Sequence, residues 1–371
     1  MDDGDAMTSP FLAQNLAFDL AISATSLFFA WRLFLLARAR GEGRPWALAA
    51  AVVIGGGCGL LPWLAAGGLE GSIWGFALAA RALWTGATVA APVAAAAAAV
   101  RGRRAAWLLP AAALVALKWW GEAGEPARLE VQRATIEVPG LRRPVRVAHF
   151  SDLQTDGIRP MELRARAEAN AYDPDVVVFT GDVMNHAALK AASYEYLAGF
   201  TARGAKLMVG GDVDGGLDRA AFEAATGFEW IDGKARAVTA GGARLSFLGF
   251  GLLDYRKGAA FAEGLVRLSG EPDARLALSH RPDAAFALKG LPVAVLFTGH
   301  THGGQIVIPG FGPPVTLTRV PRLVAAGGVH LLDGLAVSLA RGFGWEGHVA
   351  PRVRLFCRPH LILAELVPPA R

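Results

Sequence analysis

Charged residues are scarce in this sequence. Asp, Glu, Lys and Arg together make up 19% of the 371 residues, while hydrophobic residues make up 53%. In a typical soluble domain about a quarter of the residues are charged. The shortage excludes a disordered or fibrous chain and argues against an ordinary cytosolic enzyme, so we expect part of the chain to enter a membrane.

The sequence also has only two cysteines, and it has no run of basic residues interleaved with aromatic residues. The two cysteines, Cys58 and Cys357, lie far apart in the sequence, so neither a disulfide framework nor a cysteine metal site follows from them. The formal net charge is +5, but the arginines are scattered and do not alternate with aromatic residues. We therefore expect no nucleic-acid partner. The sequence gives no indication of an oligomeric state.

Long apolar stretches fill the first third of the chain instead. A helix needs about 20 apolar residues to cross the hydrocarbon core of a bilayer. Buried helices of a large soluble core are the disfavoured alternative, because the stretches contain so few polar residues. We therefore expect residues 1–121 to form a bundle of about four transmembrane helices. The expected spans are residues 15–36, 46–66, 82–100 and 105–120.

Arginines between these stretches predict the orientation of the bundle. One group, Arg38 to Arg44, lies between the first two spans, and another, Arg101 to Arg104, lies between the last two. Positively charged loops remain on the cytoplasmic side. An even number of spans then places the region after Glu122 outside the cytoplasm. We expect a multi-pass protein of the inner (plasma) membrane, with the lipid bilayer as a partner.

The sequence pattern changes after residue 121. Short apolar runs of strand length alternate with helical patterns, which predicts an α/β domain with parallel strands over residues 122–371. The expected strands are residues 146–150, 176–180, 206–209, 245–250, 276–279 and 293–298, and the expected helices between the early ones are residues 161–171, 189–202 and 217–226.

Asp or His residues follow five of these expected strands. The carboxyl ends of strands are where α/β sheets place their ligands, and alternate residues of an extended chain share a face. Mixed carboxylate and imidazole ligands suit Mn²⁺, Fe or Zn²⁺ better than Ca²⁺ or Mg²⁺. We therefore expect one or two divalent metal ions at this edge. The residues are Asp152 and Gln154, Asp182, Asp212 and Asp214, His280, and His300 and His302.

The order of these motifs resembles that of the calcineurin-like metallophosphoesterases, in particular their bacterial membrane-anchored branch. The resemblance covers residues 145–367, and segments 278–283, 341–344 and 354–359 are also similar to that branch. The family pattern is Asp-x-His, Gly-Asp, Gly-Asn-His-Asp/Glu, a lone His and Gly-His-x-His. It appears here as Asp152-Leu153-Gln154, Gly181-Asp182, Gly211-Asp212-Val213-Asp214, His280 and Gly299-His300-Thr301-His302.

The resemblance implies a fold and a site. The fold is a four-layer α/β/β/α sandwich with two metals at one sheet edge. Asp152 and His302 belong to the first metal, with Gln154 as a weak further ligand, and Asp182 bridges both metals. Asp212, His280 and His300 complete the second, so that His300 and Asp182 are also the expected catalytic residues.

The resemblance also implies a function, a metal-dependent phosphohydrolase that cleaves a phosphoester or pyrophosphate bond. Two ions about 3.5–4 Å apart hold a bridging hydroxide for in-line attack on the phosphoryl group. Membrane anchoring favours a substrate held at the bilayer surface, so a phosphorylated small molecule or a lipid-linked substrate is expected. That substrate class rests on analogy and on location.

Three positions depart from the family pattern. Gln154 replaces an imidazole ligand by a weak amide oxygen, and Asp212 adds a negative charge where the family has Asn. Val213 stands where the family has the His thought to protonate the leaving group. Loss of a general acid costs about 10²- to 10⁴-fold in rate. His186 is a possible substitute proton donor, and a solvent-exposed loop histidine is the alternative.

These departures keep a second function open. A degenerate relative would bind metal or lipid without turnover and act as a partner or sensor module. Gln154 and Val213 favour this alternative, whereas Asp182, His280 and His300 oppose it. A transporter is a weaker alternative, because the apolar stretches contain few ionisable residues that would form a pathway.

Overall fold

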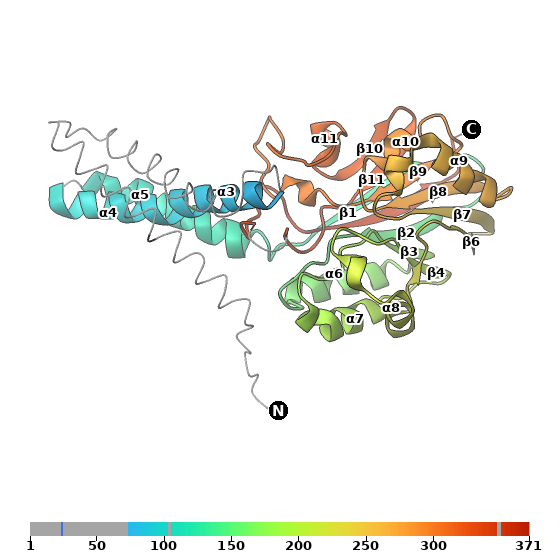
Figure 1. Ribbon diagram of the computed structural model, residues 1–371, viewed down its shortest axis with the longest axis horizontal. Coiled ribbons are helices and arrows are strands. Elements are labelled where there is room, and N and C mark those ends of the chain that lie inside the picture. Colours follow the sequence, from blue (N-terminus) through green and yellow to red (C-terminus); the bar gives the residue numbers. More distant parts are fainter. Residues whose placement is uncertain (1–23, 25–72, 103–104, 347–349, 371) are drawn as a thin grey trace, which may run out of the picture. The chain divides into compact units, whose positions relative to one another are not determined.

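The structure is a computed structural model and describes residues 24, 73–102, 105–346 and 350–370 (Figure 1). The chain divides into two compact units. One comprises residues 1–122 with 347–352, and the other comprises residues 123–346 with 353–371. Each unit is described by itself.

The first unit contains three helices in its described part. α3 (Ile73–Thr85) leads through a π-helical segment, Gly86–Ala90, into α4 (Ala91–Gly102), and α5 (Leu108–Trp119) follows a 3-10 turn. These helices have 13, 12 and 12 residues. A π segment widens the hydrogen-bond register from four residues to five and so ends each regular α-helix.

The short lengths of these helices do not agree with part of the expected transmembrane bundle. Among the residues that the structure describes, no helix combines the length and the apolar character needed to cross a bilayer. The stretches 82–100 and 105–120 are both helical, but the π segment Gly86–Ala90 divides the first, and the second begins with a 3-10 turn that leaves only 12 residues for α5. The other two expected spans, 15–36 and 46–66, fall almost entirely outside the described residues. The four-helix transmembrane bundle is therefore not supported by the described structure.

The second unit is built on two six-stranded sheets. All six expected strands are present, as β2, β3, β4, β7, β8 and β9, and they pair in parallel within each sheet. The first sheet has the order β1 (Glu130–Glu137), β12 (His360–Val367), β2 (Val145–Phe150), β3 (Val176–Phe179), β4 (Ala205–Met208), β5 (Glu229–Trp230). The second has the order β10 (Gly328–Leu332), β11 (Leu335–Leu339), β9 (Val295–Thr298), β8 (Ala274–Ser279), β7 (Ala243–Phe250), β6 (Ala235–Ala240).

Helices cover the outer face of each sheet, which gives the four layers expected from the resemblance. The helices α6, α7 and α8 lie on the side of the first sheet, and α9, α10 and α11 lie on the side of the second (Figure 1). Their bounds are α6 Pro160–Ala171, α7 Lys190–Ala198, α8 Arg219–Thr226, α9 Gly258–Leu268, α10 Ala284–Ala287 and α11 Arg322–Ala325.

Three apolar clusters hold these layers together. One lies between the sheets, where Val147 and Val178 of the first sheet join Phe247 and Phe297 of the second. The other two lie between each sheet and its helices. Since the central parallel strands β2, β3, β8 and β9 are buried at nearly every position, continuous apolar runs rather than alternating ones were the correct sequence signal for them.

The strand register determines where the polar motifs meet. Phe150 pairs with Phe179, and Phe179 pairs with Met208, so β2, β3 and β4 end at one edge of the first sheet. In the second sheet β8 and β9 are parallel neighbours in the same way. The loops that follow these strands carry the expected site residues.

Candidate metal centre

The site residues lie at abrupt turns directly after their strands. Asp152, Asp182, His300 and His302 all have positive φ angles, of 47°, 61°, 70° and 47°. Residues other than glycine adopt this left-handed conformation rarely, because their Cβ atoms crowd the backbone. Such backbone strain persists only where the surrounding structure enforces it, and it concentrates at functional sites.

Glycines beside these turns allow the strand ends to approach closely. A Cβ atom at Gly299 would lie 1.9 Å from Ser151 Oγ and 2.5 Å from Asp152 Oδ2. A Cβ atom at Gly211 would lie 2.2 Å from Asp182 Oδ1. All three distances are far below van der Waals contact, so any larger residue at either position would push the site residues apart.

Three residues form what we call the first cluster: Asp152, Asp182 and His302. Their side chains are buried, and one ligand atom from each lies within 4.8 Å of the others. His302 Nε2 lies 3.5 Å from Asp152 Oδ1. Asp152 also accepts the backbone N–H of His300, at 3.1 Å, which ties the first motif to the last.

Three more residues form the second cluster: Asp212, His280 and His300. Asp212 Oδ2 lies 2.8 Å from His300 Nδ1 and 3.3 Å from His280 Nε2. His280 Nε2 also lies 3.4 Å from Asp182 Oδ2 of the first cluster. Asp182 therefore stands between the clusters, where a ligand shared by two ions has to be.

Hydrogen bonds from neighbouring groups outside the clusters orient the cluster residues. Thr180 O accepts a hydrogen bond from His280 Nδ1 at 2.7 Å, so the other ring nitrogen, Nε2, faces the cluster. Asp214 accepts the backbone N–H groups of Asp182, Val183 and Gly211 at 2.7–2.9 Å. Asp214 thus holds the strand ends in place and belongs to neither cluster.

The charges of the site suit a divalent cation. Burial, aided by the nearby Asp214 and Asp152 carboxylates and opposed by His280, raises the pKa of Asp182 well above its usual value. Burial acts on Asp212 in the same direction, but hydrogen bonds from His280 and His300 outweigh it and lower the pKa. Several carboxylates brought together out of water need a positive charge to compensate them.

The histidine of the first cluster, His302, is a neutral ligand at neutral pH. Burial lowers the pKa of His302 to about 4, although Asp152 opposes the shift, so its imidazole is uncharged at neutral pH. His302 Nε2 forms no hydrogen bond with any residue that the structure describes. A neutral, buried and unpartnered imidazole nitrogen beside carboxylates is the donor set that Mn²⁺, Fe and Zn²⁺ accept. The residues present therefore fit divalent metal ions.

The three departures have distinct surroundings. Gln154 is buried, and its side-chain Oε1 accepts no hydrogen bond from the described residues. Val213 is partly buried, and its backbone N–H donates to Asp182 Oδ1 at 3.0 Å. His186 precedes the short 3-10 helix Ala187–Leu189, is partly exposed and belongs to neither cluster. Its role as a proton donor stays a prediction.

Two charged residues near the clusters were missed by the sequence reasoning. Arg281 Nη2 donates to Asp212 Oδ1 at 2.5 Å. Glu346 Oε2 lies 4.0 Å from His302 Nε2. Arg281 directly follows His280, and this adjacency was a usable signal. Glu346 stands outside every motif, so only the folded chain shows its position.

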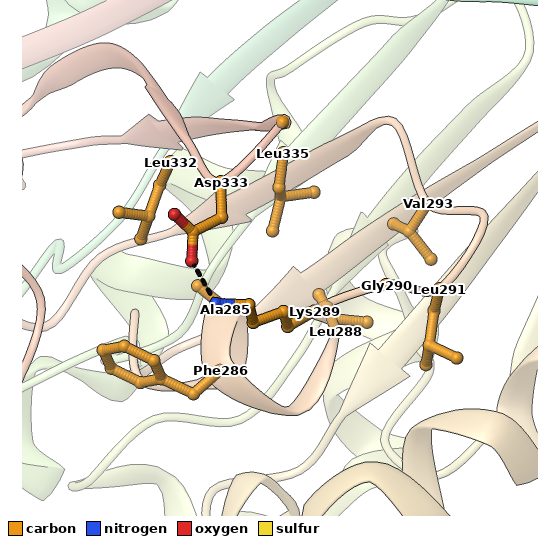
Figure 2. A pocket seen from close by; sticks show the side chains of 11 residues that line it. Ala285, Phe286, Leu288, Lys289, Gly290, Leu291, Val293, Leu332, Asp333 and Leu335 are labelled. Carbon is orange, nitrogen blue, oxygen red and sulfur yellow. Dashed lines mark hydrogen bonds and ion pairs between the residues drawn. The ribbon is translucent and has the colours of Figure 1, made fainter.

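A hollow elsewhere on the second unit is lined by other residues (Figure 2). Phe286, Leu288 and Leu335 contribute apolar side chains, and Lys289 pairs with Asp333 at 2.8 Å. It contains none of the residues of the two clusters.

Comparisons with known proteins show the family of this chain. The family model for calcineurin-like phosphoesterases matches residues 145–304. The uncharacterised metallophosphoesterase YkuE of Bacillus subtilis is 30% identical over 223 residues, which cover 56% of this chain and 77% of YkuE. The phosphodiesterase YaeI of Escherichia coli is 34% identical over 93 residues, which cover 25% of this chain and 32% of YaeI. This chain belongs to the calcineurin-like metallophosphoesterase family.

Proposed function

We propose that the chain is a metal-dependent phosphohydrolase that cleaves phosphodiester bonds at the paired clusters. The observation that carries the proposal is the 3.4 Å separation of His280 Nε2 and Asp182 Oδ2, which joins two metal-ligand groups into one centre. The names of the relatives, a metallophosphoesterase and a phosphodiesterase, support the same class of reaction.

Different residues of the chain have different roles in the proposed hydrolysis. When bound, divalent ions would supply polarisation of a phosphoryl oxygen and a water of lowered pKa. Asp152 and Asp182 contribute the negative charge that holds such ions, and the buried histidines exclude bulk water. Arg281, which lies 2.5 Å from Asp212, is placed to attract an anionic phosphate to the second cluster.

Departure of the leaving group is the weak step of this site. Val213 has no proton to give, so an alkoxide leaving group would depart unprotonated. A leaving group that is stable as an anion, such as an aryl oxide or a phosphate, needs much less help. We therefore expect substrates with acidic leaving groups, which include pyrophosphate bonds.

The location and the substrate are further parts of the proposal. The long apolar runs before residue 121 and the arginines between them support a membrane-associated protein whose phosphoesterase unit lies outside the cytoplasm. A substrate carried on a lipid would suit that location. A lipid-linked phosphodiester with an acidic leaving group, such as a lipid-linked pyrophosphate, is thus the substrate class that we propose.

The proposal is tested by hydrolysis of an aryl phosphodiester and an aryl phosphomonoester before chelation, after chelation, and after return of Mn²⁺, Fe²⁺ or Zn²⁺. We expect diester hydrolysis that disappears with the metal and returns with it. His300→Ala removes a ligand of the second cluster and is expected to be inactive. His330→Ala is the matched control, because His330 lies on β10, donates a hydrogen bond from Nε2 to Gly327 O and belongs to neither cluster. Hydrolysis that survives chelation would contradict the proposal.

A further inference from the structure

We infer that Glu346 is a metal ligand of the first cluster, where it takes the place of the imidazole that the family has at position 154. The inference rests on the proposed function and adds to that centre a residue outside all of the family motifs. Gln154 leaves the first cluster with a weak amide oxygen where a strong ligand is expected. Glu346 supplies a carboxylate to the same cluster from a different part of the chain.

The distances around His302 carry this inference. Its Nε2 atom lies 3.5 Å from Asp152 Oδ1 and 4.0 Å from Glu346 Oε2. Ligand atoms bound to one ion at about 2.1 Å each lie at most about 4.2 Å apart. Both separations fall within that limit. His302 therefore has ion-sharing spacing with each of the two carboxylates. Glu346 stands outside the group of Asp152, Asp182 and His302 whose ligand atoms all lie within 4.8 Å of one another, so its partly exposed side chain has to turn toward the ion.

Backbone hydrogen bonds bring Glu346 to this position. Gly344 N donates to Asp152 O at 3.0 Å, and Trp345 N donates to Gln154 O at 3.4 Å, so the segment before Glu346 runs along the first motif. A Cβ atom at Gly344 would lie 2.2 Å from Gln154 O. This close approach needs glycine, and it places Glu346 beside the cluster that lacks its imidazole.

A second set of contacts fixes Glu346 from the other side. Its backbone N–H donates to Gln305 Oε1 at 2.9 Å, and Gln305 lies three residues after His302 in the last motif. The ring of Trp345 packs against the Arg159 guanidinium at 4.3 Å. Glu346 is therefore held between the first and last motifs rather than carried on an unconstrained loop.

The exchange of an imidazole for a carboxylate changes the metal preference. With Glu346, the first cluster offers three carboxylates, those of Asp152, Asp182 and Glu346, and one imidazole. Oxygen-rich donor sets favour Mn²⁺ and similar hard ions over Zn²⁺. The carboxylate of Asp212 acts in the same direction at the second cluster. Mn²⁺ is accordingly the probe for the experiment.

The experiment counts the Mn²⁺ ions that the full-length protein retains after gel filtration, by elemental mass spectrometry. We expect two ions in the unmodified protein and one in Glu346→Gln, with the dissociation constant of the lost ion raised at least about tenfold. Glu263→Gln is the matched control, since Glu263 is an exposed carboxylate on α9 that pairs with Arg267. It is expected to retain two ions. Equal melting temperatures in chelator would show that the substitutions leave the fold intact.

A rescue experiment separates a ligand from a merely structural residue. Gln154→His returns the family's imidazole, so the double variant Gln154→His with Glu346→Gln should regain the second ion. If Glu346→Gln keeps both ions, or the double variant still holds one, the inference is overturned. Diester hydrolysis by the unmodified protein would leave the proposed function standing in either case. Two retained ions without any hydrolysis would instead overturn the proposed function alone.

Discussion

The backbone N–H of Val213 donates a hydrogen bond to Asp182 Oδ1 at 3.0 Å. Position 213 therefore still supports the carboxylate between the two clusters, although its side chain carries no proton. The main-chain role of this position and the proton-donor role of the family's histidine are separable. A histidine introduced here would keep the first role and add the second.

The first prediction follows from this separation. Val213→His should speed hydrolysis of alkyl phosphodiesters by about tenfold or more and change aryl phosphodiesters much less, because help from a general acid grows with the basicity of the leaving group. Initial rates on both ester classes with Mn²⁺ present measure the effect. Equal acceleration of the two classes would show that the histidine acts otherwise than by protonating the leaving group.

A second prediction concerns the close approach at Gly299. Gly299→Ala would place a Cβ atom 1.9 Å from Ser151 Oγ, so Asp152 and His300 have to move apart. We expect loss of Mn²⁺ binding at the first cluster and a destabilisation of a few kcal/mol, as for overpacked buried sites (about 1–3 kcal/mol). Metal retention and urea unfolding report the two effects.

Gly264→Ala is the control for that substitution. Gly264 lies in α9, and the nearest atom to its added Cβ is the flexible end of Arg267, at 3.9 Å. Alanine in a helix is favoured over glycine by about 0.5–1 kcal/mol, so this variant should be slightly more stable and bind metal normally. A similar loss in both variants would mean that crowding at Gly299 is not the cause.

The third prediction is a pH dependence of stability. Burial lowers the pKa of His149 from 6.5 to about 3. In the folded protein its ring nitrogens lie 2.9 Å from Ser338 Oγ and 3.2 Å from Thr180 Oγ1. Between these values the unfolded chain binds a proton that the folded chain does not. The contribution of His149 to stability is therefore complete above pH 6.5 and is lost as the pH falls toward 3.

His149→Gln tests this dependence, since an amide can hydrogen bond but does not titrate. The free energy of unfolding, measured by urea in chelator between pH 7 and pH 4.5, should fall less steeply in the variant. The difference in slope should be at most about 1.4 kcal/mol per pH unit. Parallel pH profiles would show that His149 does not contribute to the acid sensitivity.

The fourth prediction concerns topology. The arginines that separate the apolar runs predict that the phosphoesterase unit lies outside the cytoplasm. A reporter active only outside the membrane, fused after Arg371, should be active, and a matched cytoplasmic reporter at the same position should be silent. The opposite pattern would contradict both the orientation and a substrate at the outer face of the membrane.

Much of the second unit was predictable from the sequence, for a physical reason. Strands buried on both faces read as short apolar runs, and Asp182 or His280 after such a run marks a strand end where ligands gather. Glu346 was not predictable. It lies far from Asp152 along the chain, and backbone hydrogen bonds, which leave no pattern in the side chains, bring the two together.

In the first unit, by contrast, the sequence did not predict the lengths of the helices. Hydropathy sums apolar character over a window but carries no information on where the helical hydrogen-bond register changes. The π segment Gly86–Ala90 interrupts the stretch 82–100, and the 3-10 turn Ala105–Trp107 occupies the start of the stretch 105–120. Their composition predicted helix correctly and predicted helix length wrongly.

The central claim is that Asp182 joins two metal sites into one hydrolytic centre. Its most direct test is a titration of Mn²⁺ into metal-free protein, with bound ions and the initial rate of aryl phosphodiester hydrolysis measured on the same samples. We predict no hydrolysis without metal and a rate that reaches its maximum only when two ions are bound per chain. A protein that holds two ions and cleaves neither aryl nor alkyl esters, even as Val213→His, would contradict the claim and favour a module that binds metal without turnover.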